Sequence, residues 1–136
     1  MQARVKTMND KWIKVVFIAA GLYDGVLAFA FLVIPEAIYN YYQVEPPNHL
    51  GYVEFPAMLL LIFAVMFFRI ALNPVKCREL MLYGAALKFC YAFLVFRYAI
   101  TIGVPFMWIP WAWVDSVFLV LFLLAWFQIG RLSRVS

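Results

Sequence analysis

The sequence predicts an all-α integral membrane protein, an antiparallel bundle of four transmembrane helices. Of its 136 residues, 68% are hydrophobic and only 13% are charged, whereas soluble domains carry roughly 45–50% apolar and about 25% charged residues. Four apolar runs are each long enough to cross a hydrocarbon core, which takes about 20 residues. This composition excludes a soluble enzyme, a secreted disulfide scaffold and a nucleic-acid-binding module. The length allows a single membrane domain, residues 1–136.

The boundaries of the four predicted helices are marked by proline and glycine. The helices are expected over residues 15–34, 55–72, 80–102 and 110–129. Pro56 and Pro110 lie in first turns and Pro35 follows an end, positions where a missing N–H is harmless. The first run is too long for the apolar segment of a signal peptide and is not followed by a small-residue cleavage site, so we expect it to remain as a helix.

The distribution of lysine and arginine predicts the orientation. Nine of the eleven lie in the N-terminal segment, around the second connection or in the C-terminal tail: Arg4, Lys6, Lys11, Lys14, Arg69, Lys76, Arg78, Arg131 and Arg134. The first connection (35–54) and the third (103–109) contain none. Because cytoplasmic loops carry the excess of basic residues, we expect both termini in the cytoplasm and the protein in the inner (plasma) membrane of a bacterium.

Aromatic residues mark the opposite rim of the predicted bundle. They flank the first and third connections: Tyr39, Tyr41, Tyr42, Tyr52, Trp108, Trp111 and Trp113. Amphipathic rings prefer the headgroup level, so interfacial anchoring explains them, and Trp12 and Trp126 are expected to do the same on the cytoplasmic side. The alternative is an aromatic ligand site, for which Trp108 and Trp111 are the candidate contacts.

Four charged residues lie at membrane depth in the predicted spans: Asp24, Lys88, Arg97 and Asp115; Arg69 lies only one turn from the end of its span. A charge at this depth costs roughly 2.5–3.5 kcal/mol on insertion scales, so each needs a partner or a water-filled cavity. With every span centred in the bilayer and a rise of about 1.5 Å per residue, Asp24 lies close to Lys88 in height and Arg97 close to Asp115. These heights predict two ion pairs, Asp24–Lys88 and Arg97–Asp115.

Helical periodicity supports the first pair, because both residues share a face with small side chains, which let membrane helices approach closely. The small residues are Ala20, Gly21 and Ala28 beside Asp24, and Gly84, Ala92 and Ala99 beside Lys88. Arg97 is half a turn out of phase with Lys88 and should point away from it. Glu54, at the external start of the second helix, is an alternative partner for Arg97, and extension of the arginine towards the headgroups is a third solution.

Residues for several kinds of chemistry are absent from the sequence. His49 is the only histidine, so it cannot supply the two axial ligands of a membrane b-type haem or a histidine metal cluster; it is a candidate ligand contact in the first external loop. There is no Cys-x-x-Cys pair, phosphate loop or dinucleotide fingerprint. A non-catalytic protein is favoured, no metal site is predicted and no cofactor is indicated.

Three segments resemble a group of small bacterial four-span membrane proteins of uncharacterised function. They are residues 46–57 (PPNHLGYVEFPA), 73–88 (from NPVK to YGAALK) and 105–110 (PFMWIP). In the number and size of its spans the chain is also similar to DoxX-like proteins, some of which are small subunits associated with membrane quinone oxidoreduction. Neither resemblance assigns catalytic residues to this sequence.

These observations predict a non-catalytic subunit or assembly factor of a larger membrane complex, and a redox complex is one candidate. Two alternatives stay open: a small proton-coupled transporter that uses Asp24 or Asp115, and a quinone- or lipid-binding membrane protein. The expected partners are the lipid bilayer and a second membrane protein or a second copy of this chain, and no nucleic acid.

Overall fold

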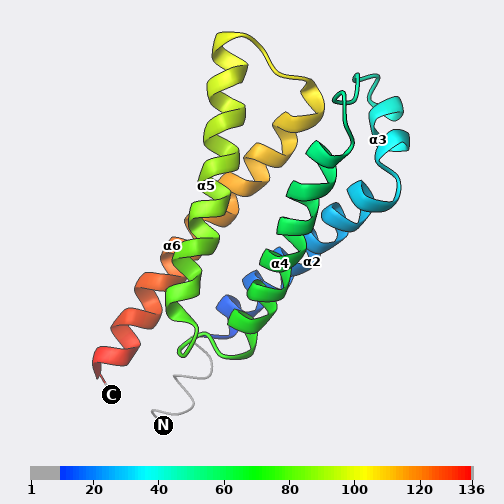
Figure 1. The fold of residues 1–136 in the computed structure, drawn as a ribbon. Coiled ribbons are helices and arrows are strands. Elements are labelled where there is room, and N and C mark those ends of the chain that lie inside the picture. Colours follow the sequence, from blue (N-terminus) through cyan, green and yellow to red (C-terminus); the bar gives the residue numbers. More distant parts are fainter. Residues whose placement is uncertain (1–9, 136) are drawn as a thin grey trace.

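The computed structural model describes residues 10–135, and this part of the chain is helical without any strand. In chain order the helices are α2 (Lys11–Val33), α3 (Pro35–Tyr41), α4 (Gly51–Leu72), α5 (Arg78–Thr101), the 3₁₀ helix η1 (Phe106–Trp108) and α6 (Ile109–Val135) (Figure 1). Helices α2, α4, α5 and α6 are each long and apolar enough to cross a membrane. The predicted all-α class and the four spans are therefore confirmed, and the protein is a multi-pass membrane protein.

The helix boundaries differ from the prediction at the rims of the bundle. Helix α2 begins four residues earlier than residue 15, and α6 runs to Val135 rather than to residue 129. Pro35 does not simply end a helix: Ile34 leaves the helical region at φ −131° and ψ 44°, and Pro35 then opens α3. A residue before proline is disfavoured in the α region, so the chain breaks at Ile34 and resumes as a short helix that the hydropathy pattern did not reveal.

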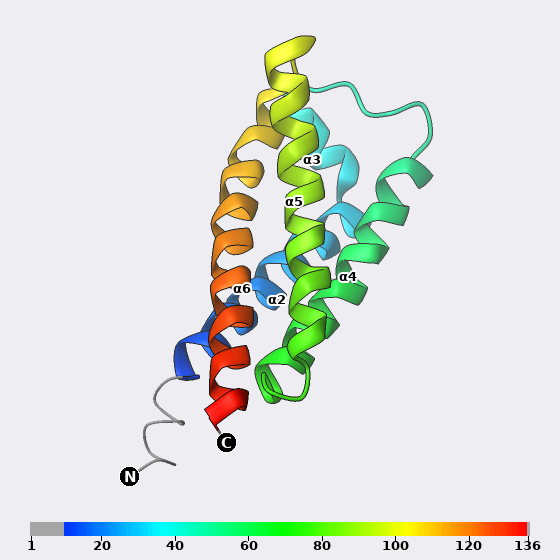
Figure 2. The same ribbon diagram turned by 90° about the vertical axis from the view of Figure 1, so that its left-hand side faces the viewer.

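The bundle consists of two antiparallel helix pairs. Helix α2 packs along α4, and α5 packs along α6. The two pairs meet through smaller interfaces, between α4 and α5 and between α2 and α6. Figures 1 and 2 show that the pairs are close together where α4 connects to α5 and diverge towards the end that carries α3 and η1. The start of α2 and the end of α6 lie at the same end of the bundle, as four antiparallel spans require.

The closed end of the bundle is filled by a buried aromatic cluster. The rings of Phe17 and Phe122 stack with centroids 4.5 Å apart, and Phe67 lies 5.1 Å from Phe122. All three side chains are fully buried. At the rim beyond them the indole N–H of Trp12 donates to Gln128 Oε1 at 3.1 Å, which ties α2 to α6.

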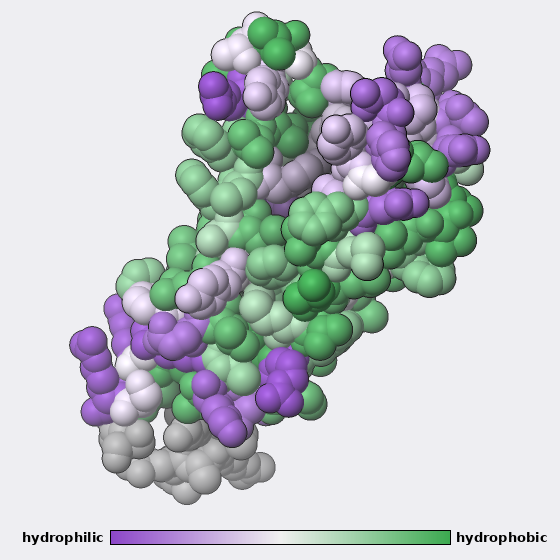
Figure 3. All heavy atoms as spheres, in the orientation of Figure 1, coloured by the Kyte–Doolittle hydropathy of each residue, from purple (hydrophilic) through white to green (hydrophobic). Residues whose placement is uncertain are grey.

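The predicted small-residue faces are packing faces. A Cβ atom added to Gly21 would lie 2.8 Å from the ring of Phe68, and one added to Gly84 would lie 2.6 Å from the ring of Phe67. Gly84 and Lys88 are both buried. On the outside, large apolar side chains form a continuous band, and hydrophilic residues gather at the two ends of the molecule (Figure 3).

Gly84→Ala is expected to lower the stability of the bundle by about 1–3 kcal/mol, because the new methyl group overpacks against Phe67 and Phe122. Gly25→Ala is the matched control, since its Cβ would meet Ala64 Cβ at an ordinary 3.6 Å. Thermal unfolding of the purified variants in mild detergent measures the difference. Equal melting temperatures for the two variants would show that close packing at Gly84 is unimportant.

A buried charge cluster and its cavity

Three charged side chains meet where the two helix pairs face each other. The Lys88 ammonium of α5 donates to Asp24 Oδ1 of α2 at 2.6 Å and to Asp115 Oδ1 of α6 at 3.0 Å. The side chains of Lys88 and Asp24 are 1% exposed and that of Asp115 is 10% exposed. The predicted Asp24–Lys88 pair is therefore confirmed, but as part of a three-residue cluster.

The predicted Arg97–Asp115 pair is wrong. Asp115 binds Lys88 instead, because the antiparallel register of α5 and α6 brings these two residues together on the inner side of both helices. The height estimate aligned the midpoints of the spans and took no account of this register. A lysine ammonium has three donors, so one base can serve both acids.

Arg97 points away from the cluster, as its helical phase predicts. It is exposed, and its guanidinium lies 5.6 Å from the centroid of the Tyr98 ring. Glu54 is also exposed, and neither residue belongs to an ion pair within residues 10–135. Of the three solutions considered for Arg97, the ion pairs with Asp115 and Glu54 are absent from the described residues, and extension towards the headgroups stays a prediction.

Rings and unpaired oxygens surround the cluster. The Lys88 ammonium lies 5.2 to 5.7 Å from the ring centroids of Tyr23, Phe67 and Phe118. Asp24 Oδ2 and the Tyr23 hydroxyl are buried and have no hydrogen-bond partner in the described part of the chain. A buried polar atom without a partner is costly, so these two atoms mark the place where the site is incomplete.

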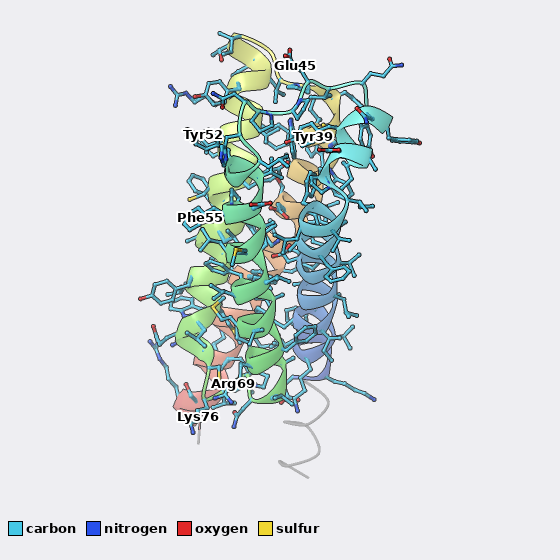
Figure 4. All side chains as sticks on the ribbon, turned by 45° about the vertical axis from the view of Figure 1, so that its right-hand side comes forward. Tyr39, Glu45, Tyr52, Phe55, Arg69 and Lys76 are labelled. Atoms are coloured by element: carbon cyan, nitrogen blue, oxygen red, sulfur yellow. The ribbon has the colours of Figure 1, made fainter. Side chains whose placement is uncertain are left out.

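The cluster lies at the inner end of a cavity of about 600 Å³ between the two helix pairs. Most of its wall is apolar and comes from α2, α4, α5 and α6, and both Asp24 and Asp115 contribute to it. Towards the end of the bundle with α3, the wall is completed by Tyr39, Glu45 and Tyr52, which Figure 4 shows together at that end. The recess between the diverging pairs is visible in Figure 3. Arg69 and Lys76 lie at the opposite end (Figure 4).

Aromatic side chains of the predicted rim have two different locations. Trp108 and Trp111 line the cavity, as does Tyr39, and Trp108 stacks on Phe31 with centroids 5.9 Å apart. Trp113, in contrast, is 63% exposed and points outwards. The alternative of an aromatic ligand site therefore fits Trp108 and Trp111, whereas interfacial anchoring fits Trp113.

His49 lies outside the wall of this cavity. Its Nδ1 accepts a hydrogen bond from the backbone N–H of Gly51 at 2.9 Å, at the start of α4. It borders a separate depression with Tyr52 and Phe55. The described residues hold no group of three or more histidine, cysteine, aspartate or glutamate side chains that could bind a metal ion.

Three polar residues of the cavity wall were not predicted from the sequence: Tyr23, Tyr91 and Glu45. Tyr23 adjoins Asp24, and Tyr91 follows Lys88 by three residues on the same helix. The Tyr91 hydroxyl donates to the backbone carbonyl of Trp108 at 3.0 Å. A polar ring within one turn of a membrane charge is a signal that could have identified both tyrosines; Glu45 offered no signal, because it lies in an irregular loop.

No protein-family model, no curated protein and no solved structure matches this chain, so its function is argued from the geometry above.

Lys88→Met is expected to destabilise the fold by about 3–5 kcal/mol, because it leaves two buried carboxylates without a counter-charge. Arg97→Met removes an exposed charge from the same helix and should have a much smaller effect. Thermal unfolding in detergent compares the two. Adding Asp24→Asn and Asp115→Asn to Lys88→Met should restore most of the stability, and failure of this rescue would contradict the charge argument.

Proposed function

We propose that this protein binds an amphipathic small molecule within the membrane, with the polar group of the ligand at Asp24 and Asp115 and its apolar part in the cavity. The observation that carries the proposal is the position of the charge cluster at the inner end of a large, mostly apolar cavity. Among the hypotheses from the sequence, this corresponds to the lipid- or quinone-binding protein.

The dimensions and chemistry of the cavity support binding. Ligand sites in proteins measure about 300–1,000 Å³ and combine an apolar wall with a few convergent polar groups. Here the volume is about 600 Å³, and the polar residues of the wall include Asp24 and Tyr23, whose Oδ2 and hydroxyl atoms are buried and without a partner in the described part of the chain. A ligand that donates hydrogen bonds would supply the partners that these atoms lack in the protein.

A binding role fits the structure better than proton-coupled transport does. The cavity extends from the cluster towards α3 and η1, while the other side of the cluster is filled by the fully buried rings of Phe17, Phe67 and Phe122. A transporter must expose its site to each side of the membrane in turn, whereas a binding site needs only the single opening that this structure shows. Binding is also compatible with an accessory subunit, because it requires no catalytic residue.

We further propose that both termini are cytoplasmic and that the cavity faces the outside of the inner membrane. The proposal is supported by the basic residues, which gather at the end of the bundle opposite α3, including Arg69, Lys76 and Arg78.

Cysteine labelling tests this orientation in a background without the natural cysteines (Cys77→Ser, Cys90→Ser). Val75→Cys, in the α4–α5 connection, should react with a membrane-impermeant maleimide only after the cells are permeabilised. Asn48→Cys, in the α3–α4 connection, should react in intact cells, and both side chains are exposed. The reverse pattern would place the cavity on the cytoplasmic side.

Obstruction of the cavity tests the binding role. Leu60 of α4 lines the cavity and is half-buried, so Leu60→Trp should fill part of it and reduce the amount of the amphipathic small molecule that co-purifies severalfold. Ile62→Trp is the matched control, since Ile62 lies on the same helix and is 64% exposed on the outer surface. Mass spectrometry of organic extracts from equal amounts of purified protein gives the comparison. The binding role would be rejected if no specific molecule were more abundant in extracts of the natural protein than in extracts of Leu60→Trp.

A further inference from the structure

We infer that the cavity is selective for a lipophilic cation, a protonated amine attached to an apolar body, over neutral and anionic amphiphiles. The inference rests on the proposed binding role and adds the chemical class of the ligand. It is carried by the charges of the cavity wall, by the composition of the cluster and by the rings around it.

The ionisable side chains that line the cavity are acidic, apart from tyrosine. Asp24 and Asp115 lie at its inner end and Glu45 at its mouth, and no lysine, arginine or histidine is among the described residues of the wall. Lys88 does not line the cavity, although its ammonium binds both aspartates. A ligand that enters therefore meets carboxylates rather than the ammonium.

The cluster carries one acid more than it carries bases. With both carboxylates ionised, the two acids and the one ammonium would carry a net charge of −1 in a site whose side chains are 1% to 10% exposed. An uncompensated charge in such surroundings is expensive and calls for a counter-charge. A proton or a cationic ligand can provide it, and only the ligand makes use of the adjoining cavity.

The aromatic rings in the cavity wall also favour a cationic ligand. Tyr23 and Trp111 lie with centroids 5.9 Å apart beside Asp24 and Asp115, and all four residues line the cavity. Cations are attracted to the faces of tryptophan and tyrosine, more strongly where water is excluded. The Lys88 ammonium, 5.2 Å from the Tyr23 ring, already uses this interaction within the protein.

The composition of the cavity wall disfavours ligands with phosphate or carboxylate headgroups. Anionic headgroups are recognised by arginine, lysine or clustered backbone N–H groups, and no basic side chain belongs to the described wall. Glu45 at the mouth would repel an anion and attract a cation during entry. An amine without a phosphate therefore fits this cavity better than a phospholipid or a fatty acid does.

Matched octyl probes test the selectivity. Octylamine (protonated at neutral pH), octanol and octanoate share one apolar tail and differ in the charge of the head. Each is titrated calorimetrically into the full-length protein in phosphatidylcholine nanodiscs, with empty nanodiscs as the blank. We expect octylammonium to bind at least about tenfold more tightly than the other two probes. Octanol or octanoate binding equally well would overturn the inference while leaving the binding role intact, and no binding of any probe would count against both.

Variants assign the selectivity to the cavity. Glu45→Gln, in an exposed loop and harmless to the core, should weaken octylammonium binding by about threefold, the effect of one surface charge. Glu36→Gln removes an equal exposed charge from α3 outside the cavity wall and should leave binding unchanged.

Asp115→Asn should weaken binding of octylammonium by at least about tenfold without affecting octanol. Equal effects of Glu45→Gln and Glu36→Gln, or an unchanged preference in a folded Asp115→Asn variant, would contradict the inference.

Discussion

The ammonium of Lys88, held between two carboxylates, is the interaction on which the arrangement of this bundle depends. A charge at membrane depth needs a partner or a water-filled cavity, because the lipid chains cannot solvate it. Asp24 and Asp115 come from α2 and α6, one from each helix pair, and both bind the single base on α5. The Lys88–Asp24 contact therefore links the two helix pairs, which also meet through apolar side chains and the Trp12–Gln128 hydrogen bond, and the Lys88–Asp115 contact links α5 to α6.

The two ends of the bundle differ around this cluster, and the difference creates the site. On one side the rings of Phe17, Phe67 and Phe122 fill the space between the helices, and Gly84 lets them approach. On the other side the rings of Phe31, Tyr39 and Trp108 pack together and connect α2, α3 and η1 beside the cavity. Charges that lie deep in the bundle are thus reached from one direction.

The features that could be predicted from the sequence are those that depend on the residues of a single helix. The spans follow from hydropathy, and the inward direction of Asp24 and Lys88 and the outward direction of Arg97 follow from a 100° periodicity. The partner of Asp115 could not be predicted in this way, because it depends on how α6 slides along α5. The cavity depends on α3, η1 and the separation of the helix pairs, which no single residue determines. Tyr23 was missed because a tyrosine within an apolar run is usually core or interface.

The presence of a second carboxylate, that of Asp115, distinguishes a ligand-binding role of the cluster from a purely structural one. Asp24 and Lys88 alone would form a neutral pair, sufficient to fix the register of α2 against α5. Asp115 adds the desolvation of another acid without adding a base, and this cost is repaid only by good geometry and additional hydrogen bonds. Asp115 links α6 to α5 through Lys88 and also faces the cavity. An unbalanced carboxylate at the inner end of a cavity is explained if the balancing charge arrives with a ligand.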